Sequence, residues 1–219
     1  MVYFPYWAED VFLQTEFRVD REAWVKSKMP EGFSVTFSGN IGIAQDLETL
    51  VQAALLLKNE TDIHFVILGE GHSKAHLEEM VKRLGLEKQV HFLGSYPTED
   101  MPIFYKYSDA LFVSLVRDPL FAMTVPSKVQ AYMAGGKPVI AALEGEGAEI
   151  VTLASCGQVV APGDAQSLAD GILRLKSLSQ EEREALGRNG QDYYMEKFHR
   201  KKTLFRFHNI GTELYDSDL

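Results

Sequence analysis

The chain has 219 residues, of which 46% are hydrophobic and 24% charged, an ordinary composition for a globular protein. This length predicts one α/β domain of roughly 150–200 residues with short flanking segments. The formal net charge of −9 argues against a nucleic-acid-binding protein and against attraction of the whole surface to anionic lipid. The local basic stretch Arg200–Arg206 leaves peripheral membrane contact open, although a solvated helix face is the preferred interpretation.

The chain has one cysteine, Cys156, so it forms no internal disulfide and fits a reducing cytoplasm. Nothing in the sequence supplies an activating base, and we interpret Cys156 as a small core residue. No run of 18 apolar residues exists, so the sequence predicts no membrane span. We expect a cytoplasmic protein, with the inner face of the membrane as the alternative location.

The N-terminus, MVYFPYWAED, is aromatic and acidic and lacks the basic region of a signal peptide. We interpret residues 1–32 as an interdomain linker that can hold a helix and that follows a domain absent from this chain.

From Phe33 onward, short apolar runs alternate with amphipathic stretches. The first half is predicted to contain, in order, strand Phe33–Phe37, helix Asp46–Lys58, strand Ile63–Leu68, helix Lys74–Leu84, strand Val90–Leu93, helical segment Thr98–Tyr107 and strand Ala110–Leu115. Gly85 is a natural C-cap for the second of these helices.

The second half follows the same alternation. It is predicted to contain helix Pro126–Met133, strand Val139–Ala142, short helix Gly147–Ala154, strand Gln158–Ala161, helix Asp164–Lys176, a helix from Gln180 to about Lys197 and a last helix over Lys201–Tyr215. Pro126 is expected in a first helical turn, and Asp164 as an N-cap. Ser179 and Glu182 are spaced as in a capping box.

About six buried-looking strands joined by helices predict an α/β fold, a Rossmann-like three-layer arrangement with a parallel sheet. We expect this domain over residues 33–178 and C-terminal helices over residues 179–219. Ligands of such folds bind at the carboxyl ends of the strands. The loops that follow the strands are therefore the places to look for function.

Two of these loops carry phosphate-binding features. Gly39-Asn40-Ile41-Gly42 lies between a strand and a helix, where glycines let a phosphate approach the backbone; a plain tight turn is the alternative. Val125-Pro126-Ser127-Lys128 combines a fixed helix start, a hydroxyl and a positive charge. This combination suits a diphosphate, although an ordinary capped helix with a solvated lysine has the same pattern.

The histidines give no metal signature. His64 and His91 lie in apolar strands and are interpreted as partnered structural residues. His72 and His76 are one helical turn apart, but no third ligand is apparent, so we predict no metal site. Three glutamates crowd one late loop and suit either sugar hydroxyls or solvent: Glu144, Glu146 and Glu149.

Taken in order, these segments resemble the C-terminal domain of group 1 (family 4) retaining glycosyltransferases of the two-domain GT-B fold. The similarity is carried by FSGNIG, VILGEG, VHFLGSYP, SDALFVSL, VPSKVQAYMAGGKPVIAA and GQVVAPGD, and it runs from about Phe33 to Lys176. The best match is the bacterial surface-polysaccharide branch.

The resemblance implies a role for each matching position. Gly39, Asn40 and Gly42 would lie against the diphosphate of a nucleotide-sugar donor, which Ser127 and Lys128 would hold at a helix start. No cofactor or metal is implied, because the nucleotide sugar is a substrate.

The nucleotide base would lie beside Gly94, Ser95 and Tyr96. The loop implied to face the donor sugar and the leaving group comprises Arg117, Asp118, Pro119 and Leu120. No catalytic side chain is named.

The chain departs from the family in its cations. The family commonly has an arginine at the position of Asn40 and a lysine at that of Gln45, and these stabilise the leaving diphosphate. Here Lys128 remains, with Arg117 as a further candidate.

It also lacks the two glutamates that the family places eight residues apart, which fall on Met123 and Ala131. The second usually binds the ribose hydroxyls, so three interpretations stay open: weak donor binding, another ribose contact, or a degenerate enzyme.

The resemblance implies that the full-length protein transfers a hexosyl unit, with UDP the favoured nucleotide, to a cell-surface glycan or lipid-linked acceptor. This chain alone is expected to bind donor without turnover, because the acceptor site belongs to the N-terminal domain that it lacks. Two alternatives stay open: a nucleotide-sugar 2-epimerase of related architecture, and a non-catalytic domain with a degenerate donor site.

Overall fold

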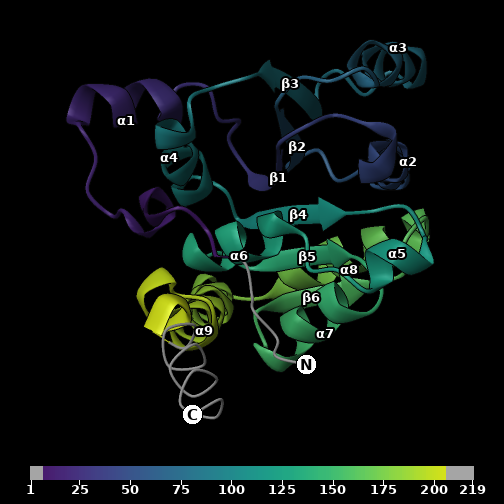
Figure 1. Cartoon of the computed structure of the whole chain (residues 1–219). Helices are drawn as coiled ribbons and strands as arrows, with labels where there is room; N and C mark the ends of the chain where they lie inside the picture. Colours follow the sequence, from purple (N-terminus) through teal and green to yellow (C-terminus); the bar gives the residue numbers. More distant parts are fainter. Residues whose placement is uncertain (1–6, 206–219) are drawn as a thin grey trace, which may run out of the picture.

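The computed structural model describes residues 7–205, whose strands form a six-stranded parallel sheet (Figure 1). The strands are β1 (Phe33–Ser38), β2 (Ile63–Leu68), β3 (Val90–Gly94), β4 (Ala110–Ser114), β5 (Val139–Ala142) and β6 (Gly157–Val160). They lie in the order β3-β2-β1-β4-β5-β6, and every neighbouring pair is parallel. The winding direction therefore reverses between β1 and β4, which is where α/β sheets bind ligands.

Helices and short 3-10 turns connect these strands. The α-helices are α1 (Val19–Lys26), α2 (Leu47–Leu56), α3 (Lys74–Leu84), α4 (Met101–Lys106), α5 (Pro119–Ala122), α6 (Ser127–Ala134), α7 (Glu146–Leu153), α8 (Ala165–Ser177) and α9 (Gln180–Lys197). The 3-10 turns are η1 (Asp10–Leu13), η2 (Ile43–Gln45) and η3 (Thr98–Asp100).

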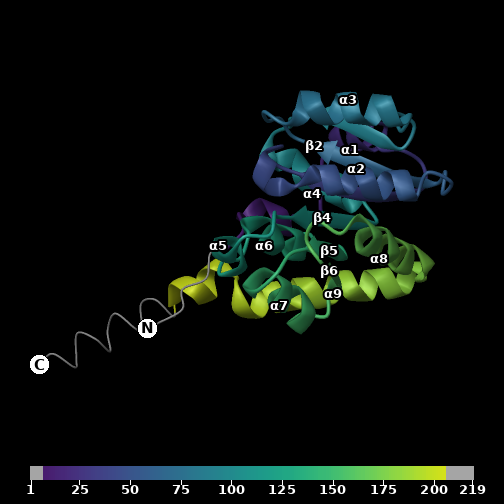
Figure 2. The same ribbon diagram turned by 90° about the vertical axis from the view of Figure 1, so that its right-hand side faces the viewer.

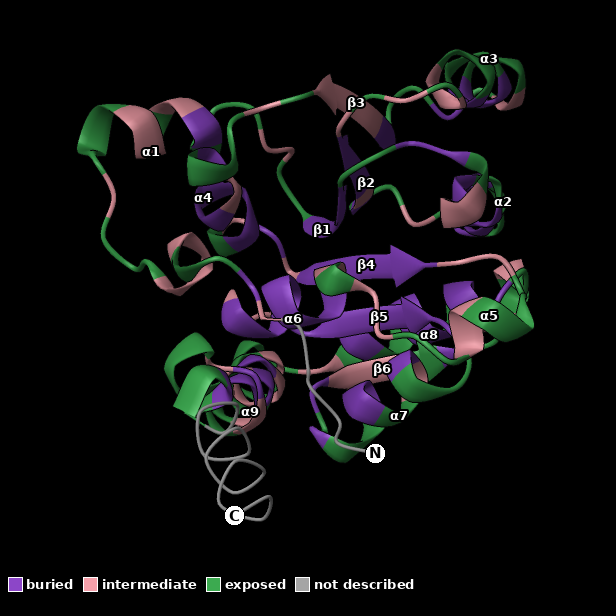
Figure 3. Ribbon diagram, in the orientation of Figure 1, coloured by how far each residue is buried: buried purple, intermediate pink, exposed green. Residues whose placement is uncertain are grey.

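The helices cover both faces of the sheet and make three layers. One hydrophobic cluster joins α2, α3 and α8 to the sheet face that carries Val35 and Phe37. The second joins α1, α4, α6, α7 and α9 to the face that carries Val66 and Leu111. Figure 2 shows α2 beside α8 on the first face, and in Figure 3 strands β4 and β5 are buried along their whole length.

Strand β1 is apolar on one face and polar on the other, although all six of its residues are buried. On the polar face, Thr36 Oγ1 lies 2.6 Å from Ser108 Oγ, and Ser38 Oγ lies 2.7 Å from the Tyr105 hydroxyl. Both partners come from α4 or the residues just after it. The hydroxyls of β1 are therefore satisfied without water, as burial requires.

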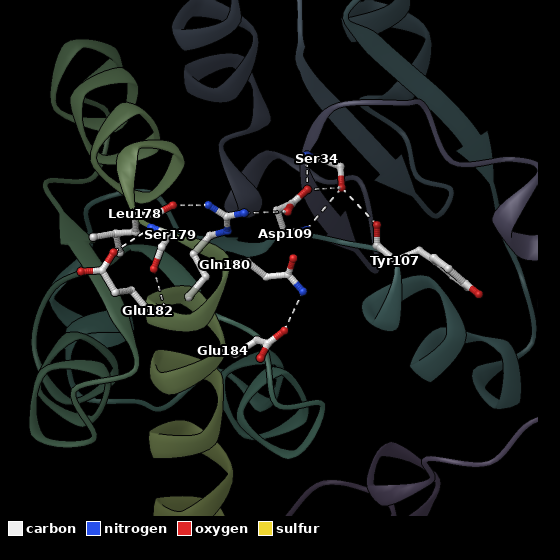
Figure 4. A network of polar contacts seen from close by, with 9 residues as sticks. Ser34, Tyr107, Asp109, Leu178, Ser179, Gln180, Glu182 and Glu184 are labelled. Carbon is white, nitrogen blue, oxygen red and sulfur yellow. Dashed lines mark hydrogen bonds and ion pairs between the residues drawn. The ribbon is translucent and has the colours of Figure 1, made fainter.

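A polar network joins α9 to the amino ends of β1 and β4 (Figure 4). The Ser34 amide donates to the Asp109 carboxylate over 2.9 Å, and an Arg183 nitrogen lies 3.7 Å from the other Asp109 oxygen. The start of α9 is fixed by the reciprocal bonds between Ser179 and Glu182, which form the predicted capping box. The long helix is thus anchored to the sheet at its first turn.

The α/β class and the six-stranded parallel sheet are confirmed. The predicted bounds of β2, α3 and β5 agree with the structure residue by residue, and Gly85 and Asp164 cap α3 and α8 as expected. Continuous apolar runs between glycine-rich turns leave little freedom in where a buried strand begins or ends.

Several expected details differ. Pro126 has φ −59° and ψ 133° and is the N-cap of α6, so it lies outside the first turn in which it was predicted. The segment predicted as helical over 98–107 is a 3-10 turn followed by α4, and the loop before α6 contains the additional helix α5. Residues 200–205 are helical, and the remainder of the predicted helix Lys201–Tyr215 lies outside the described residues.

Helix α9 approaches the turn after α6 too closely for a side chain at Gly187, where a Cβ would lie 2.1 Å from the Gly136 carbonyl oxygen. We predict that Gly187→Ala lowers the free energy of unfolding by about 2 kcal/mol or more, because α9 must move off the turn. Urea denaturation measures this. Asp192→Ala, at an exposed position of the same helix, is the control and should unfold like the wild type; equal stability of the two variants would contradict the close contact.

Candidate functional site

A cavity of about 500 Å³ opens at the carboxyl ends of β1 and β2 and beside the first turn of α6. It is lined by Ala8, Glu9, Phe12, Ser38, Gly39, Asn40, Leu68, Gly69, Glu70, Ser95, Tyr96, Thr98, Met101, Tyr105, Ser127, Lys128 and Ala131. It is of the size that holds a small-molecule ligand. Five segments that are distant in the sequence build its walls, so the fold itself assembles it.

The loops after β1 and β2 form one wall by lying backbone against backbone. The Gly39 amide donates to the Leu68 carbonyl over 2.8 Å, and the Ile41 amide to the Glu70 carbonyl over 2.9 Å. A Cβ at Gly69, whose φ is +139°, would lie 1.9 Å from the Gly39 carbonyl oxygen. Glycine at this position is required by the contact between the two loops.

Lys128 is the cation of the cavity. Its side chain passes Gly39, where a Cβ would lie 2.6 Å from Lys128 Cε, and its Nζ lies 5.2 Å from the centre of the Phe37 ring. Among residues 7–205, no carboxylate forms a salt bridge with it. Burial lowers the pKa of Lys128 below its ordinary value, because the charged form loses water and gains only an aromatic face.

The start of α6 adds hydrogen-bond donors beside this ammonium. Pro126 is extended and ends the preceding loop, so the helix begins at Ser127. The first hydrogen bond of the turn joins the Val129 amide to the Pro126 carbonyl over 2.9 Å. The amides of Ser127 and Lys128 come earlier and have no partner within the helix. Together with the helix dipole, they suit an anion.

A cluster of hydroxyls forms the inner end of the cavity. The Ser38 amide donates to the Tyr132 hydroxyl over 3.1 Å, and Ser38 Oγ contacts the Tyr105 hydroxyl. Burial raises the pKa of Tyr132 to about 12, so it stays protonated near neutral pH. The cluster gives the cavity a fixed polar end without a charge.

The loop after β3 forms the opposite wall. Gly94 has φ +82° and turns the chain away from the sheet, which exposes Ser95 and leaves Tyr96 half-buried. The Tyr96 ring packs on Phe104, with 4.7 Å between ring centres, and on Trp24, with 5.6 Å. An aromatic ring and backbone groups therefore face the cavity from this side.

The N-terminal segment supplies a further wall that the sequence did not predict. Ala8, Glu9 and Phe12 line the cavity, and the Phe12 ring stacks on Tyr105 with 5.7 Å between ring centres. The Tyr194 hydroxyl of α9 donates to the Ala8 carbonyl over 3.2 Å. The aromatic composition of this segment was its one signal, and nothing in the sequence identified the partner.

Six of the twelve predicted site residues lie at this cavity. Gly39, Asn40, Ser95, Tyr96, Ser127 and Lys128 line the one cavity, and Gly42 and Gly94 lie in the loops that form its walls without lining it.

Four other predicted residues lie around a separate small hollow or beside it: Arg117, Asp118, Pro119 and Leu120. The Arg117 side chain pairs with Glu144 over 2.9 Å, and the Asp118 carboxylate caps α5.

The positions that depart from the family pattern have local roles. Gln45 accepts a hydrogen bond from the Gly42 amide over 3.1 Å and so closes its own turn. Ala131 is 9% exposed and lines the cavity, so no carboxylate extends from that point of α6. The carboxylates that do line the cavity are Glu9 and Glu70, and Glu70 is paired with Lys74 over 2.7 Å.

Outside the cavity, Cys156 and the two strand histidines have structural environments. Burial raises the pKa of the Cys156 thiol to about 12, which leaves it protonated and unreactive near neutral pH. His64 Nδ1 lies 3.1 Å from His91 Nε2, so the two histidines are each other's partners. Across residues 7–205, no group of three or more His, Cys, Asp or Glu side chains is arranged to hold a metal ion, and no helix is long and apolar enough to cross a membrane.

Comparison with known proteins identifies the family. The model for glycosyl transferases group 1 matches residues 20–193. The chain belongs to this family. It is 35% identical over 146 residues to the putative colanic acid biosynthesis glycosyl transferase WcaI of Escherichia coli, covering 65% of this chain and 35% of that protein. It is 33% identical over 174 residues to the probable glycosyltransferase WbjE of Pseudomonas aeruginosa, covering 74% and 42%. The chain thus spans less than half the length of these relatives.

Solved structures place this glycosyltransferase chain in the C-terminal domain of the GT-B fold. The C-terminal domain of the group 1 protein LpcC from Francisella tularensis superposes with a TM-score of 0.66 at 26% identity, covering 86% of this chain and 96% of that domain. Anabaena HepE in complex with UDP and glucose superposes with a TM-score of 0.75 at 21% identity, covering 93% of this chain and 55% of that one. The second match shows a shared fold.

The unpaired Lys128 should lower the stability of the ligand-free protein. We predict that Lys128→Met raises the free energy of unfolding by about 0.5–2 kcal/mol, because methionine fills the same space without a desolvated charge. Thermal and urea unfolding without ligand measure the change. Lys82→Met, at an exposed position on α3, is the matched control and should be neutral. A loss of stability in Lys128→Met would show that the contact with Phe37 outweighs the burial of the charge.

Proposed function

We propose that this chain is the donor-binding half of a retaining glycosyltransferase that uses a UDP-sugar. The observation that carries the proposal is Lys128, a half-buried ammonium without a carboxylate partner in the described chain, beside the free amides of α6. A diphosphate supplies the charge that this ammonium lacks. The relation of the fold to HepE, whose structure contains UDP and glucose, supports uracil as the base.

The proposed orientation follows from the walls of the cavity. The diphosphate lies at Ser127 and Lys128 and against Gly39, Asn40 and the Gly42 loop, and the base lies at the Gly94-Ser95-Tyr96 wall. Arg117, Asp118, Pro119 and Leu120 belong to the loop that would meet the donor sugar once the second domain closes the cleft.

Catalysis would rest on positioning and on stabilising the leaving diphosphate. As negative charge grows on the leaving group, the Lys128 ammonium and the first-turn amides of α6 would hold it in a half-desolvated place where electrostatic interactions are strong. We therefore name no side-chain nucleophile or base in this chain, and we expect no metal.

The acceptor side of the function is proposed from the relatives. WcaI is described as a colanic acid biosynthesis enzyme, so we propose a cell-surface glycan or lipid-linked acceptor. The relatives' greater length supports an acceptor domain N-terminal to the residues described here. In this proposal residues 33–178 are the donor domain, and residues 179–219 would pack back toward the acceptor domain. We prefer a solvated helix face for the basic stretch Arg200–Arg206, with peripheral contact with the inner membrane face as the alternative. Turnover is expected to require the longer protein.

Calorimetric titration with UDP, with GDP as the comparison nucleotide, tests the donor site. We predict that Lys128→Met weakens UDP binding by about tenfold to a hundredfold, the effect of losing one charge-assisted hydrogen bond. The control Lys82→Met should bind UDP like the wild type. If Lys128→Met leaves the UDP affinity unchanged, the diphosphate does not bind at Lys128.

One alternative is a non-catalytic domain, and the observation that favours it is that Ala131 replaces the glutamate with which the family binds the ribose hydroxyls. We predict that Ala131→Glu strengthens UDP binding by about tenfold or more, because a carboxylate there can accept from ribose hydroxyls. Ala131→Gln is the uncharged control and should gain much less. If neither variant binds UDP, the non-catalytic alternative is supported.

A nucleotide-sugar 2-epimerase remains the alternative enzyme, and it differs in product. The full-length protein incubated with a UDP-sugar and no acceptor would release the epimerised nucleotide sugar if it were an epimerase. A transferase would consume donor only when a glycan or lipid-linked acceptor is present.

A further inference from the structure

Helix α1 holds the loop that forms the Tyr96 wall of the cavity. The loop runs from Ser95 to Asp100 and leads into α4. Asp100, at its end, has a side chain only 8% exposed, and it is bound on both oxygens by Arg21 of α1. Arg21 Nε donates to one oxygen over 2.6 Å, and a guanidinium nitrogen donates to the other. A buried carboxylate held by a two-pronged guanidinium fixes the end of the loop.

Trp24, one turn further along α1, extends this connection to the cavity wall. The Arg21 guanidinium lies over the Trp24 ring, 4.0 Å from its centre. The Trp24 ring meets the Tyr96 ring edge to face, with 5.6 Å between centres, and Tyr96 rests on Phe104 of α4. Arg21, Trp24 and Tyr96 therefore form a continuous series of contacts that ends at the cavity.

A second contact joins α1 to α4 without touching the cavity wall. The Glu22 carboxylate accepts hydrogen bonds from Lys106 Nζ over 2.5 Å and from the Tyr107 hydroxyl over 2.8 Å. In Figure 1, α1 lies beside α4, away from the sheet. The same helix thus carries one contact that leads to Tyr96 and one that holds only α1 and α4 together. Substitutions can therefore separate the support of Tyr96 from the stabilisation of the helix pair.

From this arrangement we infer that Arg21 and Trp24 are positioning residues for the nucleotide base. They hold Tyr96 and the Ser95–Asp100 loop in place before the ligand arrives. A wall that is already ordered avoids the loss of side-chain and loop freedom that binding would otherwise cause. The inference rests on the proposed donor site, and it makes recognition of the base depend on the segment that precedes the sheet.

The test compares two ligands on matched variants of the whole chain. Trp24→Ala removes the support of Tyr96, Trp24→Phe keeps an aromatic ring there, and Glu22→Gln cuts the second α1–α4 contact. Affinity for UDP and for inorganic pyrophosphate is measured by calorimetry, and stability by thermal unfolding. Pyrophosphate carries the charges that Lys128 would bind but has no base.

We predict that Trp24→Ala weakens UDP binding by about threefold to tenfold, the range expected for a lost aromatic pair, and leaves pyrophosphate binding unchanged. Trp24→Phe should recover most of the UDP affinity. Glu22→Gln should lower the melting temperature without altering either affinity. If Trp24→Ala lowers both affinities equally, or if Glu22→Gln weakens UDP as much, α1 is a structural support only and the inference is wrong.

Trp24 also offers a direct spectroscopic signal. The chain has two tryptophans, so in a Trp7→Phe background Trp24 is the single one. UDP should change its emission through Tyr96, and pyrophosphate should not. In the same background, Arg21→Lys keeps a positive charge but loses the two-pronged bond to Asp100, and it should reduce the change in Trp24 emission on UDP binding. This variant keeps the test possible if Trp24→Ala does not fold. UDP binding with no change in emission and no effect of Arg21→Lys overturns this inference alone, whereas absence of UDP binding to the wild type overturns the proposed function as well.

Discussion

The direct contact between the backbones of the loops after β1 and β2 sets the geometry of the cavity. Gly69 and Gly71 allow it: a Cβ at Gly71 would lie 2.2 Å from the Ile41 carbonyl oxygen, as one at Gly69 would collide with Gly39. The two loops are joined by amide-to-carbonyl bonds. The carboxyl ends of β1 and β2 are therefore aligned, and a hollow lies beside them. Helix α6, the Tyr96 loop and the N-terminal segment then surround that hollow.

This contact also determines the environment of Lys128. With the β1 loop held against the β2 loop, the lysine side chain passes Gly39 and lines the cavity close to the Phe37 ring. It is too deep for full hydration and has no carboxylate partner among the described residues. A charge kept in that condition reduces the stability of the free protein and favours an anionic ligand, which is a common arrangement at functional sites.

The sequence was sufficient for those parts of the molecule that depend on local pattern. The strand Ile63–Leu68 is a continuous apolar run between turns, and Gly85 ends α3 at the predicted residue. The sequence could not show which distant segments meet. Phe12 stacks on Tyr105, and Arg117 turns away to Glu144, and both outcomes depend on the completed three-dimensional arrangement. The glycines of FSGNIG were interpreted as phosphate contacts. No role was predicted for Gly69 and Gly71 of VILGEG, which the contact between the loops requires.

The hydroxyl-bearing face of β1 has a consequence for how the cavity keeps its dimensions. Apolar contacts between a helix and a sheet are not directional, so they specify the position of the helix less strictly than hydrogen bonds do. Helix α4 and the residues just after it instead meet β1 through directional bonds, at Thr36 with Ser108 and at Ser38 with Tyr105. A slip of one residue would leave several buried hydroxyls without partners at once, each an appreciable penalty. The spacing of serine and threonine along β1 therefore determines where α4 lies on the sheet, and α4 carries Phe104, on which Tyr96 of the cavity wall packs.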